Sequence, residues 1–192
     1  MIMEMTNPEI IERFKKGEIG IFPTDTAYGI GCRMDNEESL KKIYEIRNRP
    51  IEKALLVLVS SIEMAMEYVE ISEELKKNLL EKYWPGGLTV ILKCYQDKVP
   101  SIIRANGPTL AVRFPNNSDL SYVIQQVGVP IAAPSANYSG EPTPLKLAEV
   151  DQSLIEKVDF VINGVCTMEG VSTIIDASNG KMEIVRQGVL VL

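Results

Sequence analysis

The chain has 192 residues, with 20 Lys plus Arg, 26 Asp plus Glu and no His, so its formal net charge at pH 7 is −6. This length predicts a single domain over residues 1–192, with a core large enough to fold without disulfides or a structural metal. The absence of His excludes Ser-His-Asp and Cys-His catalytic pairs and zinc sites with His ligands. The acidic balance disfavours broad, non-specific nucleic-acid binding, which normally needs positive charge.

The cysteines predict a reduced, cytoplasmic protein. Cys32, Cys94 and Cys166 are odd in number and form no CxxC pair, so we expect small buried thiols rather than disulfides. Residues 1–12 contain early Glu residues and no long apolar stretch, so we expect no signal peptide. The longest strictly apolar run, 54–59, is far too short for a membrane span, and we expect no membrane partner.

Helix and strand patterns alternate through the first half of the chain. Asn7 and Pro8 predict the start of a helix that runs to Lys16, where Gly17 stops it. Asn36 begins a second helix that ends before Pro50. Along the rest of this half we expect strands over 19–22 and 54–59, a turn-rich loop over 23–31, and helices over 61–69 and 72–83.

The second half continues in the same way. We expect strands over 88–94, 109–114, 129–133, 160–162, 172–176 and 183–186, helices over 118–127 and 145–158, and a Pro/Ser/Gly loop over 134–144. Trp84, before the turn Pro85-Gly86-Gly87, is expected to pack on the core. The elements interleave without regular βαβ units, and hairpin-like pairs occur, so the sequence predicts an α/β (α+β) fold with a mixed sheet covered by helices.

Candidate chemistry lies in polar segments rather than in the usual nucleotide motifs, since neither GxxxxGK[ST] nor GxGxxG occurs. The segment PTDTAYG (23–29) places Thr24, Asp25, Thr26 and Tyr28 directly after a strand, where α/β sheets often bind ligands. The alternative is a capped turn, in which Asp25 and the Thr hydroxyls bond nearby backbone.

A cluster of cations follows the second helix. Arg47, Arg49 and Lys53 fall within seven residues, and guanidinium forks suit phosphate oxygens. The alternative is a set of cations placed favourably at a helix C-terminus. That alternative explains Arg47 and Arg49 well, but it explains Lys53 poorly, because Lys53 abuts an apolar strand.

Later segments repeat this kind of chemistry. Arg113 alternates with apolar neighbours at a strand end, and it either serves a site or faces outward from the strand. Ser135 and Asn137, in PSANYSG, can present a hydroxyl, an amide and backbone N–H groups to an anion or a base edge, or they belong to an ordinary loop. Ser172 and Arg186 are unremarkable when each is taken singly.

Taken in order, the segments PTDTAYGIG, RNRPIEKALL, WPGGLT, AVRFP, PSANYSG, STIID and RQG resemble the YrdC-type threonylcarbamoyl-AMP synthase family from about residue 17 to residue 188. The resemblance implies a twisted mixed sheet with flanking helices around a concave basic cavity, in the short, single-domain form. It also implies formation of threonylcarbamoyl-AMP and pyrophosphate from L-threonine, bicarbonate and ATP. Mg²⁺ would arrive bound to ATP with no ligand from the protein. The product would serve tRNA threonylcarbamoyladenosine modification through other proteins.

The resemblance also implies roles for individual residues. Five cations, Arg47, Arg49, Lys53, Arg113 and Arg186, are expected to converge on one cavity. The catalytic residues would be Arg47, Arg49 and Lys53; the threonine site Thr26, Tyr28, Arg113 and Ser172; and the ATP site Arg47, Arg49, Lys53, Ser135, Asn137 and Arg186.

Two departures from the family pattern keep other interpretations open. Arg47 stands where Lys is usual, and Ala54 and Gly87 stand where Pro is usual. A YciO-like paralogue that binds RNA or a nucleotide, with weak or altered activity, is therefore one alternative. Apart from these departures, a carbamoyl-adenylate enzyme like the hydrogenase-maturation proteins, which share this domain, is another alternative, although this chain lacks their extra domains.

Overall fold

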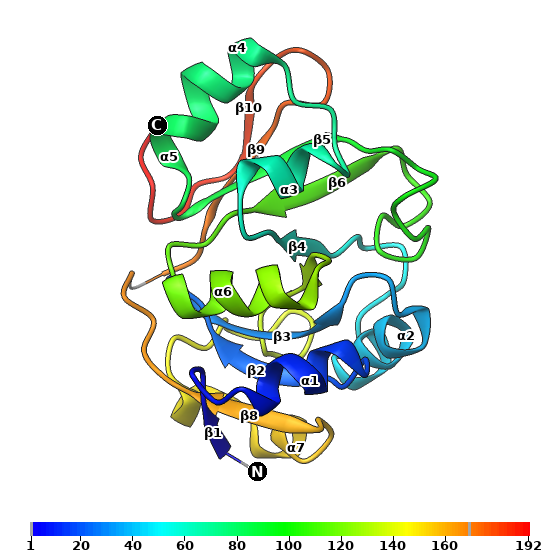
Figure 1. Ribbon diagram of the computed structural model, residues 1–192, viewed down its shortest axis with the longest axis vertical. Coiled ribbons are helices and arrows are strands. Elements are labelled where there is room, and N and C mark those ends of the chain that lie inside the picture. The colour runs from blue at the N-terminus through cyan, green and yellow to red at the C-terminus, as the bar shows by residue number, and fades with distance from the viewer. Residues whose placement is uncertain (1, 169) are drawn as a thin grey trace.

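A mixed sheet organises the protein. The computed structural model describes residues 2–168 and 170–192, and within them ten strands form one sheet in the order β1-β8-β2-β3-β7-β4-β6-β5-β9-β10 (Figure 1). Both parallel and antiparallel pairs occur in it, so the predicted mixed sheet is confirmed. The strands are β1 (Ile2–Glu4), β2 (Gly20–Pro23), β3 (Tyr28–Arg33), β4 (Leu56–Leu58), β5 (Leu88–Lys93), β6 (Thr109–Arg113), β7 (Ile131–Ala132), β8 (Phe160–Asn163), β9 (Thr173–Asp176) and β10 (Glu183–Arg186).

Helical segments cover this sheet. They are α1 (Glu9–Lys15), α2 (Glu37–Ile46), α3 (Ile62–Met66), α4 (Glu73–Leu75), the π-helical η1 (Lys76–Leu80), α5 (Glu81–Tyr83), α6 (Ser118–Val127), the 3₁₀ turn η2 (Leu147–Glu149) and α7 (Gln152–Ile155). In Figure 1, α1 and α6 lie together over one part of the sheet, and α4 and α5 lie beside β9 and β10. None of the helices in the described residues has the length and apolar character needed to cross a bilayer.

Local sequence sets the ends of the two longest helices. The Asn36 side chain accepts the backbone N–H of Ser39 at the start of α2, and Asn117 accepts that of Leu120 at the start of α6. Helix α6 ends at Gly128, whose φ of 83° lies in the left-handed region that glycine adopts without strain. The predicted bounds of α6 and β10 are confirmed.

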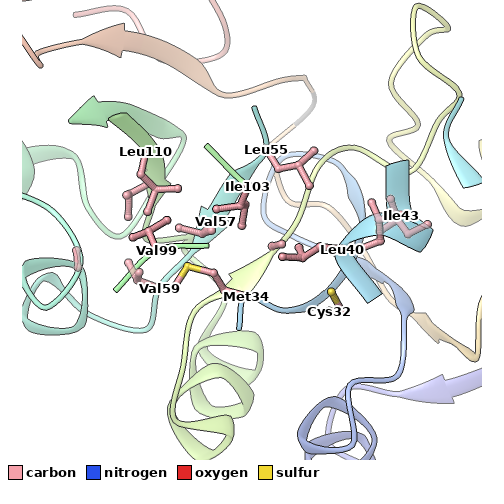
Figure 2. Close-up of a cluster of buried hydrophobic side chains, with 14 of the residues drawn as sticks. Cys32, Met34, Leu40, Ile43, Leu55, Val57, Val59, Val99, Ile103 and Leu110 are labelled. Atoms are coloured by element: carbon pink, nitrogen blue, oxygen red, sulfur yellow. The ribbon is translucent and has the colours of Figure 1, made fainter. Parts of the chain in front are cut away.

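Apolar side chains fill two clusters against the sheet. In the smaller one, Phe14 of α1 packs edge-on against Phe22 and Phe160, and apolar residues of α6 complete the layer. The larger cluster joins α2, β4 and residues 99–103, and Figure 2 shows side chains from these segments gathered together. Trp84 is buried in it and donates its indole N–H to Leu88 O, so the predicted packing role is confirmed.

The expected loop over 23–31 is wrong beyond residue 27. Residues 28–33 form β3, which pairs with β2 and with β7. A Cβ on Gly31 would lie 2.1 Å from Ala132 O, so this glycine permits close approach of two strands. Glycine and small polar residues here indicated a turn, whereas they belong to a tightly paired strand.

Other boundaries differ for local reasons. The single helix expected over 145–158 is divided into η2 and α7, because Val150 is extended and Asp151 caps a new helix. Strand β1 was missed, and it pairs in parallel with β8. The apolar run 54–59 contributes a shorter strand, and the helices expected over 61–69 and 72–83 become α3 and the run α4–η1–α5.

All three cysteines are free thiols. Cys32 and Cys94 are buried as expected, whereas Cys166 is half-buried. Burial raises the pKa of the Cys32 thiol to about 12 and that of Cys166 to about 11, so these thiols stay protonated at neutral pH.

Candidate functional site

One polar pocket collects residues from segments far apart in the sequence. Its cavity volume is about 70 Å³. Its lining combines hydroxyls, two guanidinium groups and a short apolar wall. The lining residues are Thr24, Thr26, Ala27, Tyr28, Gly29, Leu56, Leu58, Arg113, Ala133, Ser135, Thr143, Val171, Ser172 and Arg186.

Arg113, at the end of β6, is buried in the pocket wall rather than facing outward. Its Nη1 donates to Thr26 Oγ1 at 2.6 Å, its Nε donates to Gly86 O at 3.0 Å, and its Nη2 forms an ion pair with Asp25. These contacts use three of the five N–H groups of the guanidinium. The side chain is thus fixed from three sides and retains donors for a ligand.

The loop before β3 is both a capped turn and part of the site. Thr24 Oγ1 donates to Ala27 O at 2.8 Å and accepts the N–H groups of Thr26 and Ala27, each at 3.1 Å. This turn presents the Thr26 hydroxyl to Arg113. The two interpretations offered for this segment therefore describe the same geometry.

Tyr28 lines the pocket with its ring but uses its hydroxyl elsewhere. The fully buried phenol donates to Gly164 O at 2.7 Å and accepts Gly164 N–H at 3.0 Å. Burial raises the pKa of Tyr28. The hydroxyl thereby joins β3 to the end of β8, and its predicted contact with threonine stays a prediction.

Arg186 brings a second guanidinium into the pocket from β10. Its Nη2 donates to Ser172 O at 2.7 Å and to Ser172 Oγ at 3.1 Å, and the Ser172 hydroxyl lies 2.9 Å from Thr89 Oγ1. Desolvation, followed by the charge of Arg113, lowers the pKa of Arg186. Each of these positive charges disfavours the charged form of the other. An anion bound in the pocket would relieve this repulsion.

Arg47 lies directly behind this pocket. It is buried, and its Nε donates to Asn137 O at 3.0 Å, while Nη2 lies 3.3 Å from Asn137 Oδ1 and 3.5 Å from the pocket residue Ser135. Its Nη1 is buried with no hydrogen-bond partner in the described parts of the chain. Desolvation, with the charge of Arg49 second, lowers the pKa of Arg47 to about 10. An unpaired buried N–H carries a cost that an anionic ligand would remove.

Arg49 and Lys53 do not line this pocket. Arg49 donates from Nε to Lys53 O at 3.1 Å and from Nη2 to Ala54 O at 2.7 Å, and Lys53 is exposed. Of the five cations expected in one cavity, the structure therefore places Arg113 and Arg186 in the pocket and Arg47 behind it. The other two lie on the adjacent segment that leads into β4.

Several residues in or next to the pocket had no role predicted from the sequence. Asp25 stood in a noted segment, but nothing in the sequence indicated that it pairs with Arg113. Thr143 lies in the Pro/Ser/Gly loop over 134–144. The polar composition of that loop was the only sign in the sequence that it could line a site. Leu56 and Leu58 form the apolar wall, and in sequence they are indistinguishable from core strand residues.

Comparison with known proteins places the chain in a family. The Sua5/YciO/YrdC family model, described as telomere recombination, matches residues 12–188. The chain belongs to the Sua5/YciO/YrdC family. The resemblance noted in the sequence is thus confirmed, and so is the predicted mixed α/β fold.

Individual members of the family sharpen the likeness. The threonylcarbamoyl-AMP synthase of Bacillus subtilis is 33% identical over 190 residues, which cover 97% of this chain and 55% of that protein. The structure of Pyrococcus abyssi Sua5 complexed with L-threonine matches with a TM-score of 0.89 and 30% identity, over 98% of this chain and 57% of that one. The chain spans about half the length of these relatives, so the short, single-domain form stays a prediction. Escherichia coli YciO matches with a TM-score of 0.86 at 23% identity, a likeness of fold.

Proposed function

We propose that this chain is a threonylcarbamoyl-AMP synthase, which forms threonylcarbamoyl-AMP and pyrophosphate from L-threonine, bicarbonate and ATP. The observation that carries the proposal is the facing pair Arg113 and Arg186, each held by hydroxyl-bearing residues in one pocket. ATP and bicarbonate are anions at neutral pH, and zwitterionic L-threonine carries a carboxylate. The names of the family relatives supply the substrate class, and the pocket supplies a site of matching charge.

The amino acid occupies the end of the pocket near Arg113. The remaining N–H groups of Arg113 bind the carboxylate of the amino acid. A planar guanidinium and a planar carboxylate form strong, charge-assisted hydrogen bonds with each other. Thr26 and Ser172 bring hydroxyls into the pocket, and Leu58 and Ala133 offer apolar contact to a methyl group. This end of the pocket therefore suits a small amino acid with one polar and one apolar substituent.

The nucleotide lies toward Ser135 and Arg186. Arg47 supplies the unpaired Nη1 behind Ser135, and Asn137 fixes the orientation of that guanidinium. Arg49 and Lys53 supply positive charge at the neighbouring segment for phosphate oxygens. The predicted catalytic trio therefore acts through charge and position and needs no proton transfer by its side chains.

The reaction balances without a His. The threonine ammonium first loses a proton to water, and the amine then attacks the carbon of CO₂, or of bicarbonate with loss of water. A second N–H proton passes to water, or in the bicarbonate route leaves within the water that is lost, and a carbamate forms. A carbamate oxygen then attacks the α-phosphorus of ATP, the bond to the bridging oxygen breaks, and pyrophosphate leaves. The protein holds the reactants in line and neutralises charge on the phosphates.

Mg²⁺ enters with ATP. The pocket lining offers hydroxyls and guanidinium groups, and the carboxylate of Asp25, which is not part of that lining, is engaged by Arg113. No group of three or more His, Cys, Asp or Glu side chains in residues 2–168 and 170–192 could hold a metal ion. Mg²⁺ bound to the phosphates would shield their negative charge. The product passes to other proteins that modify tRNA in the cytoplasm, and direct RNA binding by this chain is a secondary proposal.

Pyrophosphate release tests the function. The purified chain should release pyrophosphate at a rate that requires ATP, L-threonine and bicarbonate together. Calorimetry of ATP with and without L-threonine separates this function from simple nucleotide binding. Release that ignores threonine, with ATP affinity unaffected by it, would overturn the proposal and favour the RNA- or nucleotide-binding alternative.

A further inference from the structure

Asp25 holds a buried carboxylate against the pocket residue Arg113, outside the pocket lining itself, and the proposed function leaves it without a role. Its side chain is 0% exposed, and that of its partner Arg113 is 5% exposed. One carboxylate oxygen pairs with Arg113 Nη2, and the other accepts the backbone N–H of Asn116 at 3.0 Å. Because both oxygens are engaged and covered, Asp25 cannot touch a ligand, and any effect it has must pass through Arg113.

Arg113 needs such a partner to keep its place. Burial disfavours its charge, and the positive charge of Arg186 lies in the same pocket. Thr26 Oγ1 and Gly86 O are neutral acceptors that fix the position of the guanidinium but cannot balance its charge. The carboxylate of Asp25 provides that balance, and Asn116 N–H fixes the direction in which it points.

We propose that Asp25 is a positioning residue that holds Arg113 so that its remaining N–H groups face the pocket and bind the carboxylate of the amino-acid substrate. The identity of that substrate rests on the proposed function. Without the negative charge, the guanidinium loses its partner at Nη2 and moves away from Arg186. The effect falls on the amino acid rather than on ATP, because Asp25 lies on the Thr26 side of the pocket.

The Asp25→Asn variant removes the charge and keeps an oxygen for Asn116 N–H. We expect the KM for L-threonine to rise roughly ten- to hundredfold, and the KM for ATP to stay within about twofold. Asp35→Asn is the matched control, because Asp35 pairs with Arg33 away from the pocket. Equal loss for both substrates, or no change in the threonine KM, would overturn the proposal.

A double-variant cycle and NMR separate positioning from general structural damage. In an Arg113→Lys background, Asp25→Asn should change the threonine KM by less than about twofold, because its effect passes through Arg113. The Arg113 Nε–H signal, assigned by its loss in Arg113→Lys, should exchange with solvent at least about tenfold faster in Asp25→Asn. Unchanged exchange would overturn the proposal whatever the enzyme does.

These readouts also distinguish the two proposals. If wild-type protein releases no threonine-dependent pyrophosphate, the function fails, while the exchange of Arg113 Nε–H still decides the role of Asp25. If Asp25→Asn does not fold, Asp25→Glu tests the same point, because the charge stays and the longer side chain displaces Arg113. A shifted Arg113 signal is then expected, and an unmoved signal contradicts the role.

Discussion

Arg47→Met tests whether Arg47 serves the fold or the ligand. The change removes a buried cation and three contacts to the 134–144 loop. The Nε bond to Asn137 O, at 3.0 Å, has normal length, and a charged hydrogen bond of this kind contributes about 1.5–3 kcal/mol. The other two contacts, at 3.3 and 3.5 Å, are long and contribute little.

Opposing terms reduce the expected loss of stability. The buried, unpaired Nη1 costs about 1–3 kcal/mol in the free protein, and Met removes that cost. The free energy of unfolding should therefore change by less than about 1.5 kcal/mol. Affinity for ATP should fall roughly ten- to hundredfold, because Met cannot supply the charged N–H that a phosphate would accept.

Urea denaturation and calorimetry with ATP measure the two quantities on the same preparation. Arg33→Met is the matched control: it makes the same change of charge in a surface ion pair with Asp35, and ATP affinity should not change. A loss of more than about 3 kcal/mol of stability with unchanged ATP affinity would show that Arg47 is structural. The unpaired Nη1 of Arg47 would then have no part in binding ATP.

Three further predictions concern single positions. Ser172→Ala removes a pocket hydroxyl that is proposed to contact the amino acid, so the threonine KM should rise roughly two- to tenfold in the pyrophosphate assay; an unchanged KM would remove Ser172 from the threonine site. Gly31→Ala places a Cβ 2.1 Å from Ala132 O, and urea denaturation should show a loss of about 1–3 kcal/mol, whereas a loss under about 0.5 kcal/mol would contradict the close approach. Burial raises the Cys32 pKa from its ordinary value of 9 to about 12, so the unfolded chain releases this proton first and stability falls as pH rises above 9. Between pH 7 and pH 10, Cys32→Ala should lose roughly 1.4 kcal/mol less stability than wild type, and equal losses would contradict the shift.

Local signals in the sequence predicted elements whose ends depend on nearby residues. Asn117 and Gly128 set both ends of α6, and each acts within its own turn, so the prediction is confirmed. The strand β3 was missed because its glycines serve contact with β7, about a hundred residues later in the chain. A glycine needed for a turn and a glycine needed for close packing look the same in sequence.

In the site too, residue types within one segment could be predicted, whereas contacts between distant segments could not. Residue types in the motifs indicated an anion site, and Arg113, Ser172 and Arg186 do share a pocket. The pairing of Asp25 with Arg113 joins positions 88 apart, and no spacing rule applies at that range. Arg49 lies away from the pocket because it donates to two carbonyl oxygens of its own segment, Lys53 O and Ala54 O. Lys53 belongs to the same segment and lies away from the pocket with it.

Three arginines of the candidate site make the same kind of contact, and this contact holds them in place in a chain whose net charge is −6. Arg47, Arg113 and Arg186 each donate Nε–H to a backbone carbonyl, those of Asn137, Gly86 and Ser172. The rigid fork is thereby anchored through one edge and keeps Nη donors for other partners, which the single ammonium of Lys cannot do in the same way. Arg47, where the family pattern has Lys, follows the same arrangement. Its fork reaches the backbone and side chain of Asn137 together, so in this chain Arg47 both holds the 134–144 loop and keeps an N–H free.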